Sequence, residues 1–228
     1  MDLSTVSAQL KPIEDGIFEI PLLLDEPLEP QRGILESTLL AAQRRLRKFA
    51  TSYGWQAHVQ QPFATQAHIY ATKAGFDHDL LEICGMDTTI ELPGTYCAAL
   101  EQDKLMCVSP GLYLAIYPEG DEECAFEKLI THEMAHRLHI RILGGDEDAM
   151  GPVWFYEGFA LFVASQFEHL HPVLSMHEVW RVIGEPERGS YRQYAAVFRH
   201  FVGKVGLPEL VENAGREDFI DWLERKSL

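Results

Sequence analysis

The sequence predicts an α+β protein, with a small mixed β-sheet and helices in its amino-terminal part and a helical carboxy-terminal part. Short apolar runs separated by Gly and Pro fill residues 55–117, whereas apolar residues at helical spacing dominate from residue 121 onward. The chain has 228 residues, 46% of them hydrophobic and 24% charged, which is ordinary for a globular protein. We therefore expect one domain over residues 1–228, made of a sheet-bearing part (1–120) and a helical part (121–228).

In the sheet-bearing part, an apolar run at 17–24 is broken by Pro21 and indicates an edge strand or an extended entry segment. Apolar residues at helical spacing across 31–53 predict one long amphipathic helix, and a short helix is expected around 77–83. The remaining apolar runs predict a mixed sheet, with strands at 55–59, 68–71, 88–92, 95–100, 105–108 and 112–117.

In the helical part, acidic and glycine residues mark the helix boundaries. Acidic residues at 121–123 favour a helix start, and Gly144-Gly145 favours a stop, so a helix is predicted to end at about Leu143. After a loop at 146–152, a second helix is expected to begin at Val153 or Trp154 and to end at about Phe167. Further helices are predicted at 175–183, 191–205 and 216–226.

Net charge and cysteine content limit which partners the protein can bind and in which compartment it can be expected. A net charge of −16 argues against nucleic acid, which binds clustered Lys and Arg. No apolar run reaches the roughly 18 residues that a membrane helix needs, and residues 1–15 lack a signal-peptide pattern. A cytoplasmic protein without a membrane partner is therefore expected, and the oligomeric state is not indicated. The four cysteines fit buried free thiols, with a Cys97–Cys107 bridge as the alternative in an oxidising compartment.

Two histidines and a later glutamate form a candidate metal site. His132 and His136 lie four residues apart on a predicted helix, so their side chains project from one face. Glu157, on the next predicted helix, adds a carboxylate. Two imidazoles and one carboxylate are the donor set of a catalytic zinc site, which keeps a fourth position for water. The sequence thus predicts one Zn²⁺ per chain, the alternative being two packing histidines and an ordinary acid at a helix start.

The residue after the first histidine is the candidate general base. Glu133 points about 100° around the helix from His132, beside the metal rather than at it. There it can take a proton from zinc-bound water and pass it to the leaving amine of a peptide. His139 lies on nearly the same face as the two histidine ligands, and we expect it to be a satisfied polar residue at the cleft wall.

Both segments resemble those of gluzincin metallopeptidases, the group that contains thermolysin and the aminopeptidase N family. The resemblance is carried by HEMAH at 132–136 and by WFYEGFA at 154–160, which follows the aminopeptidase N pattern of Trp, two variable residues and Glu-Gly-Phe-Ala. It implies a zincin-like catalytic domain, with the metal between its two parts, that hydrolyses peptides or proteins. It also implies a tyrosine that stabilises the oxyanion, here Tyr191, with Tyr194 as the runner-up, the alternative being that both tyrosines are half-buried residues of the helix.

Departures from the family pattern limit what the resemblance says about the substrate. The Gly-x-Met-Glu-Asn motif that captures the substrate amino terminus in the aminopeptidase N type is absent, and residues 94–98 take roughly its place. In this group a strand before the active helix pairs with an extended substrate, a role expected here of 112–117 or 105–108. Two alternatives to a peptidase stay open: a catalytically idle peptide-binding module, and a zinc hydrolase of a non-peptide substrate.

Overall fold

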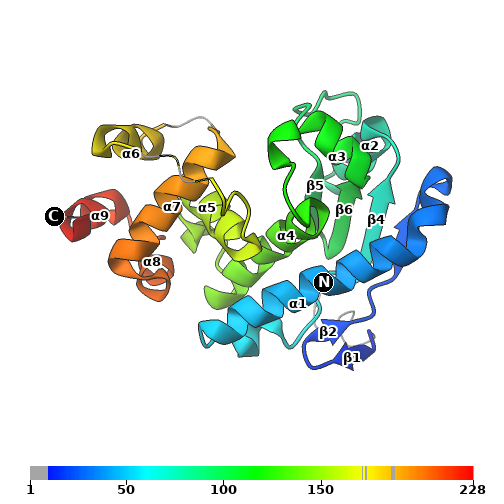
Figure 1. Cartoon of the computed structure of the whole chain (residues 1–228), viewed down its shortest axis with the longest axis horizontal. Helices are drawn as coiled ribbons and strands as arrows, with labels where there is room; N and C mark the ends of the chain where they lie inside the picture. The colour runs from blue at the N-terminus through cyan, green and yellow to red at the C-terminus, as the bar shows by residue number, and fades with distance from the viewer. Residues whose placement is uncertain (1–9, 171, 173, 186–187, 228) are drawn as a thin grey trace. The chain divides into compact units, whose positions relative to one another are not determined.

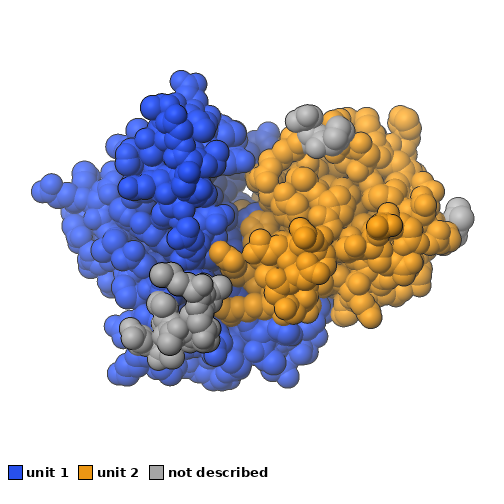
Figure 2. All heavy atoms as spheres, turned by 180° about the vertical axis from the view of Figure 1, so that it is seen from behind, with its two compact units in different colours: residues 1–134 blue, residues 135–228 orange. Residues whose placement is uncertain are grey.

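The computed structural model describes residues 10–170, 172, 174–185 and 188–227, and it is a mixed α+β structure (Figure 1). The chain divides into two compact units, unit 1 at residues 1–134 and unit 2 at residues 135–228, which Figure 2 draws in blue and orange. The division falls inside a single helix, α4 (Ala125–Ile142). Among the described residues, every strand belongs to unit 1, and unit 2 is helical.

Unit 1 is built around a four-stranded mixed sheet. Its strands, in order across the sheet, are β3 (Leu22–Leu24), β4 (Gln66–Tyr70), β6 (Lys104–Val108) and β5 (Ala98–Glu101). Strands β3, β4 and β6 are parallel, and β5 pairs antiparallel with β6. The four residues 105–108 of β6 are all buried, as expected for a parallel strand with neighbours on both sides.

Helices pack around this sheet because their apolar residues fall on one side. Along α1 (Arg32–Ser52), Leu35, Leu39 and Leu46 repeat at helical spacing and are buried. Helix α2 (Lys73–Ile83) packs on β4, β5 and β6. The remaining elements of unit 1 are a hairpin and short helices, namely β1 (Pro12–Glu14), β2 (Ile17–Phe18), η2 (Glu26–Gln31), η3 (Gln56–Val59), α3 (Pro110–Ile116) and η4 (Pro118–Gly120).

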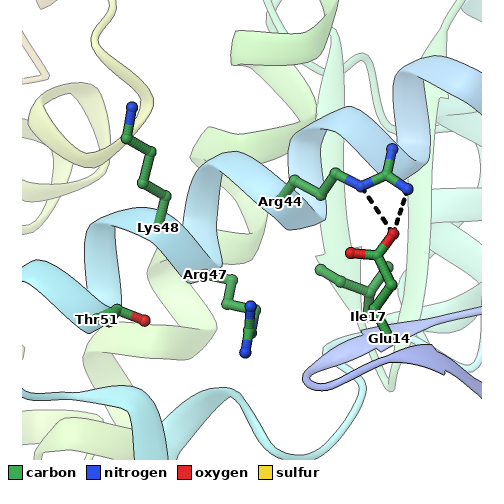
Figure 3. Close-up of a pocket in the computed structure, with 6 residues that line it drawn as sticks. All are labelled: Glu14, Ile17, Arg44, Arg47, Lys48 and Thr51. Atoms are coloured by element: carbon green, nitrogen blue, oxygen red, sulfur yellow. Dashed lines mark hydrogen bonds and ion pairs between the residues drawn. The ribbon is translucent and has the colours of Figure 1, made fainter.

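A pocket of about 280 Å³ lies where the β1–β2 hairpin meets α1 (Figure 3). Arg44 Nε donates to Glu14 Oε1 at 3.2 Å across it, and the Lys48 side chain points away from this ion pair. The buried side chain of Gln43 joins the same two elements, since it accepts from the Phe18 N–H and donates to the Phe18 carbonyl, both at 3.0 Å. The exposed ion pair adds little stability, whereas the buried amide of Gln43 joins the hairpin to α1 through two hydrogen bonds.

Unit 2 is arranged around α7, the orange helix that α5, α6, α8 and α9 contact (Figure 1). An added Cβ at Gly158 of α5 would lie 2.7 Å from Phe198 Cβ of α7, so α5 and α7 approach closely only because residue 158 is glycine. The elements of this unit beyond α4 are η5 (Asp148–Met150), α5 (Val153–Ala164), α6 (Met176–Ile183), α7 (Tyr191–Val205), α8 (Leu207–Asn213) and α9 (Phe219–Ser227).

The long helices and part of the sheet agree with the sequence-based predictions. The segment 17–24 is extended and divides at Pro21 into β2 and β3, the latter at one edge of the sheet. The helix predicted at 191–205 coincides with α7, and the strands predicted at 68–71 and 105–108 correspond to β4 and β6. Helix α8, which follows Gly206 directly, was not predicted from the sequence.

Three predicted strands are wrong. Residues 55–59 form the 3₁₀ helix η3, and 88–92 form turn and irregular structure in which Asp87 accepts a hydrogen bond from the Thr89 N–H. The apolar run at 112–117 predicts a strand, but its residues lie mostly in helix α3. Pro110 sits at the first turn of this helix, where its fixed φ favours a helical start.

All four cysteines are free thiols. Cys97 and Cys107 are buried as predicted, whereas Cys84 and Cys124 are exposed, which corrects the expectation that all four are buried. Cys97 precedes β5, and its carbonyl accepts a hydrogen bond from the N–H of Val108 at 2.8 Å. None of the described helices combines the length and the apolar character needed to cross a membrane.

Candidate metal centre

The three predicted metal ligands come together. His132, His136 and Glu157 each offer one ligand atom, and these atoms all lie within 4.8 Å of one another. Helix α4 is continuous through both histidines, so their spacing of four residues places the two rings on one face. We call these three residues the α4–α5 group.

The spacing within unit 2 fits two ligands of one ion. His136 Nε2 lies 3.7 Å from Glu157 Oε2, which is too long for a hydrogen bond. Two tetrahedral ligand atoms that each lie about 2.1 Å from zinc are about 3.4 Å apart, close to this distance. The donor set and the spacing of this pair therefore fit a shared metal ion.

Helix α5 holds Glu157 in a buried position. Only 3% of Glu157 is exposed, and it is the single charged residue between Val153 and Ala164. A buried carboxylate is costly unless charged or hydrogen-bonding groups face it. Its two oxygens face different partners, because Oε2 lies toward His136 whereas Oε1 is 2.9 Å from Arg188 Nη1.

Glu133 lies within unit 1, near the end of the sheet formed by β5 and β6. Burial raises the pKa of the Cys97 thiol to about 11 and that of the Cys107 thiol well above its usual range, and the negative charge of Glu133 adds to both increases. Cys97 directly precedes β5 and Cys107 lies in β6. The candidate base is therefore close to the antiparallel edge of the sheet.

The expected substrate-pairing strand is corrected by the sheet topology. Segment 112–117 lies in helix α3, and 105–108 is the interior strand β6, which pairs with β4 on one side and β5 on the other. In the described sheet the edges are β3 and β5. The continuous apolar run of β6 is itself a sign of an interior strand. Of the two edges, β5 is the one that begins beside Cys97, near Glu133.

The structure distinguishes between the two tyrosines at the start of α7. The hydroxyl of Tyr194, a residue only 1% exposed, accepts a hydrogen bond from the Gly189 N–H. The hydroxyl of the half-buried Tyr191 accepts from Arg188 Nη1 at 2.9 Å. The guanidinium that binds Tyr191 also binds Glu157, so Tyr191 rather than Tyr194 is connected to a predicted metal ligand.

Two residues of this neighbourhood were missed by sequence reasoning. Arg188 lies between α6 and α7, in a segment with no motif that could have singled it out. Tyr156 precedes Glu157, and its ring meets that of His136 edge to face at 5.9 Å. Burial raises the pKa of Tyr156, while a hydrogen bond and the positive charge of Arg188 oppose the increase. In the sequence, its helical position next to Glu157 was the one feature that could have pointed to Tyr156.

His139 differs from the sequence-based expectation. It is 0% exposed, its ring stacks on Phe159 with centroids 4.3 Å apart, and neither ring nitrogen has a hydrogen-bond partner among the described residues. Burial lowers its pKa to about 3, and the charge of His136 adds to the effect. His139 is therefore a neutral core residue, and the prediction of a satisfied polar residue at a cleft wall is wrong.

A second set of donors, which we call the α2 group, lies on one turn of helix α2. Its side chains also offer ligand atoms within 4.8 Å of one another, and its members are His78, Asp79 and Glu82. The His78 side chain is 59% exposed and its Nδ1 lies 3.5 Å from Asp79 Oδ1. Asp79 also accepts a hydrogen bond from the Tyr70 hydroxyl at 2.9 Å. The carboxylate of Asp79 therefore already has a hydrogen-bond partner within the protein.

Comparison of the chain with protein-family models, with curated proteins and with solved structures gives no match. The geometry of the α4–α5 group and its neighbours is therefore the basis for assigning a function.

Proposed function

We propose that the protein is a zinc-dependent metallopeptidase of the gluzincin type, in which the α4–α5 group holds one Zn²⁺. The observation that carries the proposal is the approach of two imidazoles and a buried carboxylate to within 4.8 Å of one another. The candidate base, Glu133, follows the first of these ligands on α4. A preformed set of three donors with a neighbouring carboxylate is typical of catalytic rather than structural zinc sites.

Each neighbouring residue has a chemical task in this proposal. Zinc, when bound, supplies a Lewis acid that polarises the scissile carbonyl and makes water a nucleophile near neutral pH. Glu133 accepts a proton from the attacking water and delivers it to the leaving amine. Tyr191 donates a hydrogen bond to the carbonyl oxygen as negative charge develops on it.

The substrate we propose is an extended peptide segment. Strand β5 lies at an edge of the sheet in unit 1 and begins next to Cys97, whose thiol is influenced by the charge of Glu133. An edge strand can add an extended peptide through main-chain hydrogen bonds. The absence of the motif that captures a substrate amino terminus favours cleavage within a chain over removal of its first residue.

The four free thiols are also compatible with a reducing compartment, so we propose that the protein acts in the cytoplasm. The zinc content of the purified protein does not depend on the compartment in which the protein acts. Folding in the presence of an oxidant provides a separate test, because a protein of an oxidising compartment would be expected to form a defined disulfide.

The proposed function is tested by metal analysis and peptide-library cleavage of wild type and Glu133→Gln. We expect close to one zinc per chain in both proteins, and cleavage by wild type alone. Glu82→Gln, in the exposed α2 group, is the matched control and should keep both properties. Zinc-free wild type, or full activity of Glu133→Gln, would contradict the proposal. Zinc without cleavage of any peptide would instead favour an idle binding module or a hydrolase of other substrates.

A further inference from the structure

Arg188 joins two parts of the proposed site. Its Nη1 lies 2.9 Å from Glu157 Oε1 on α5 and donates to the Tyr191 hydroxyl at 2.9 Å at the start of α7. The same side chain is hydrogen-bonded to Tyr156. All four residues belong to unit 2. One nitrogen of a guanidinium carries two hydrogens, so Nη1 can serve Glu157 and Tyr191 at the same time.

The two carboxylate oxygens of Glu157 face different side chains. Oε1 is paired with Arg188, whereas Oε2 lies 3.7 Å from His136 Nε2. A carboxylate that binds zinc through one oxygen needs a partner for the second, and such outer partners fix the orientation of the ligand. The ion pair is therefore compatible with a metal bound through Oε2.

The burial of Glu157 sets this ion pair apart from the surface Arg216–Asp218 pair. The Glu157 side chain is 3% exposed and that of Arg188 is 42% exposed. In the Arg216–Asp218 pair, by contrast, both side chains are more than two-fifths exposed, at 48% and 43%. The Arg188 side chain is partly in water, whereas the buried carboxylate depends on its partners for orientation.

We infer that Arg188 is a positioning residue that orients Glu157 for coordination through Oε2 and holds the Tyr191 hydroxyl at the site. This inference rests on the proposed function, since it assigns a role toward the same metal. A planar guanidinium has fixed donor directions that an ammonium lacks. Lysine at position 188 should therefore restore the charge but only part of the orientation.

Zinc affinity and the visible spectrum of the cobalt-substituted protein test this role without measuring activity. Relative to the full-length wild type, we expect Arg188→Gln to bind zinc about 10–100-fold more weakly, as is usual when an outer partner of a ligand is lost. We expect the zinc affinity of Arg188→Lys to lie between those of wild type and Arg188→Gln. The Co²⁺ absorption bands of Arg188→Gln should shift because the coordination of Glu157 changes. Arg216→Gln is the matched control and should behave as wild type.

The outcomes separate this inference from the proposed function. Wild-type zinc affinity and an unchanged cobalt spectrum in Arg188→Gln would overturn the role of Arg188 and leave the metal site intact. Tighter zinc binding by Arg188→Gln would also overturn it, because Arg188 would then compete with the metal. If wild type itself bound no zinc, the proposed function and the inference would both fail.

Discussion

The α4–α5 group and the α2 group contain the same kinds of donor atoms at similar spacing, but they differ in burial and in the elements that supply them. Two separate helices contribute the α4–α5 group, in which His132 is 5% and Glu157 is 3% exposed. A single turn of α2 supplies the whole α2 group, and 59% of the His78 side chain is exposed. Ligand spacing alone therefore does not separate a metal centre from a polar surface.

The two groups differ in how far folding has already prepared their donor side chains for a metal ion. Placing Glu157 inside unit 2 removes its carboxylate from water, a cost that Arg188 and a bound cation can offset. Packing also restricts the side chain, so less conformational entropy remains to be lost when a metal binds. In the α2 group, by contrast, His78 and Glu82 are exposed to water and Asp79 is hydrogen-bonded to Tyr70, so a metal would gain little there.

The largest expected effect comes from removing one ligand in each group. His136→Ala should lose zinc at concentrations that saturate wild type, because a ligand contributes more than the 10–100-fold typical of an outer partner. His78→Ala should keep the wild-type zinc content. Metal analysis of both purified variants measures this difference. Loss of zinc in His78→Ala, with zinc retained in His136→Ala, would reverse the assignment.

A second expected effect concerns the packing that holds Glu157 in place. A Cβ added at Gly158 would lie 2.7 Å from Phe198 Cβ, so Gly158→Ala should lower the free energy of unfolding by about 1–3 kcal/mol despite the better helix propensity of alanine. We also expect weaker zinc binding, because α5 must shift to relieve the contact. Chemical denaturation and zinc titration measure the two effects.

Gly203 provides the matched control for this substitution. It lies in α7, and a Cβ added there meets nothing within 4 Å. Gly203→Ala should therefore raise the free energy of unfolding by about 0.5–1 kcal/mol and leave zinc binding unchanged. Equal stability changes in both alanine variants would show that α5 and α7 do not depend on the close approach at residue 158.

An effect confined to acidic pH is expected from the core next to His136. The pKa of His139 is about 3 in the folded protein, whereas an unfolded histidine titrates near its ordinary value of about 6.5. The unfolded state therefore binds a proton first, and stability should fall by about 1.4 kcal/mol for each unit as pH decreases from about 6.5 toward 3.

His139→Leu removes this contribution and replaces the buried imidazole with an apolar side chain. It should flatten the acid side of the stability profile of the metal-free protein, measured by urea denaturation in the presence of a chelator. At neutral pH the variant should be at least as stable as wild type, because neither ring nitrogen of His139 has a partner among the described residues. A profile with the wild-type slope would show that other groups cause the acid sensitivity.

The sequence predicted the candidate site better than it predicted the sheet, for physical reasons. Helical spacing alone places His132 and His136 on one face, and the apolar surroundings of Glu157 are visible in its own segment. Strand positions depend on neighbours that are distant in the chain, and a short apolar run such as 112–117 fits a strand and a buried helix equally well, so it could not reveal helix α3. Arg188 reaches Glu157 only through the tertiary fold, and nothing in its local sequence indicates that contact.

The most direct test of the proposed zinc site is a crystal structure of the zinc-loaded protein with anomalous data collected at the zinc absorption edge. We predict one strong anomalous peak within about 2.0–2.2 Å of ligand atoms of His132, His136 and Glu157. At the α2 group we predict no peak of comparable height. A peak at the α2 group without one at the α4–α5 group, or no bound zinc in either place, would contradict the account.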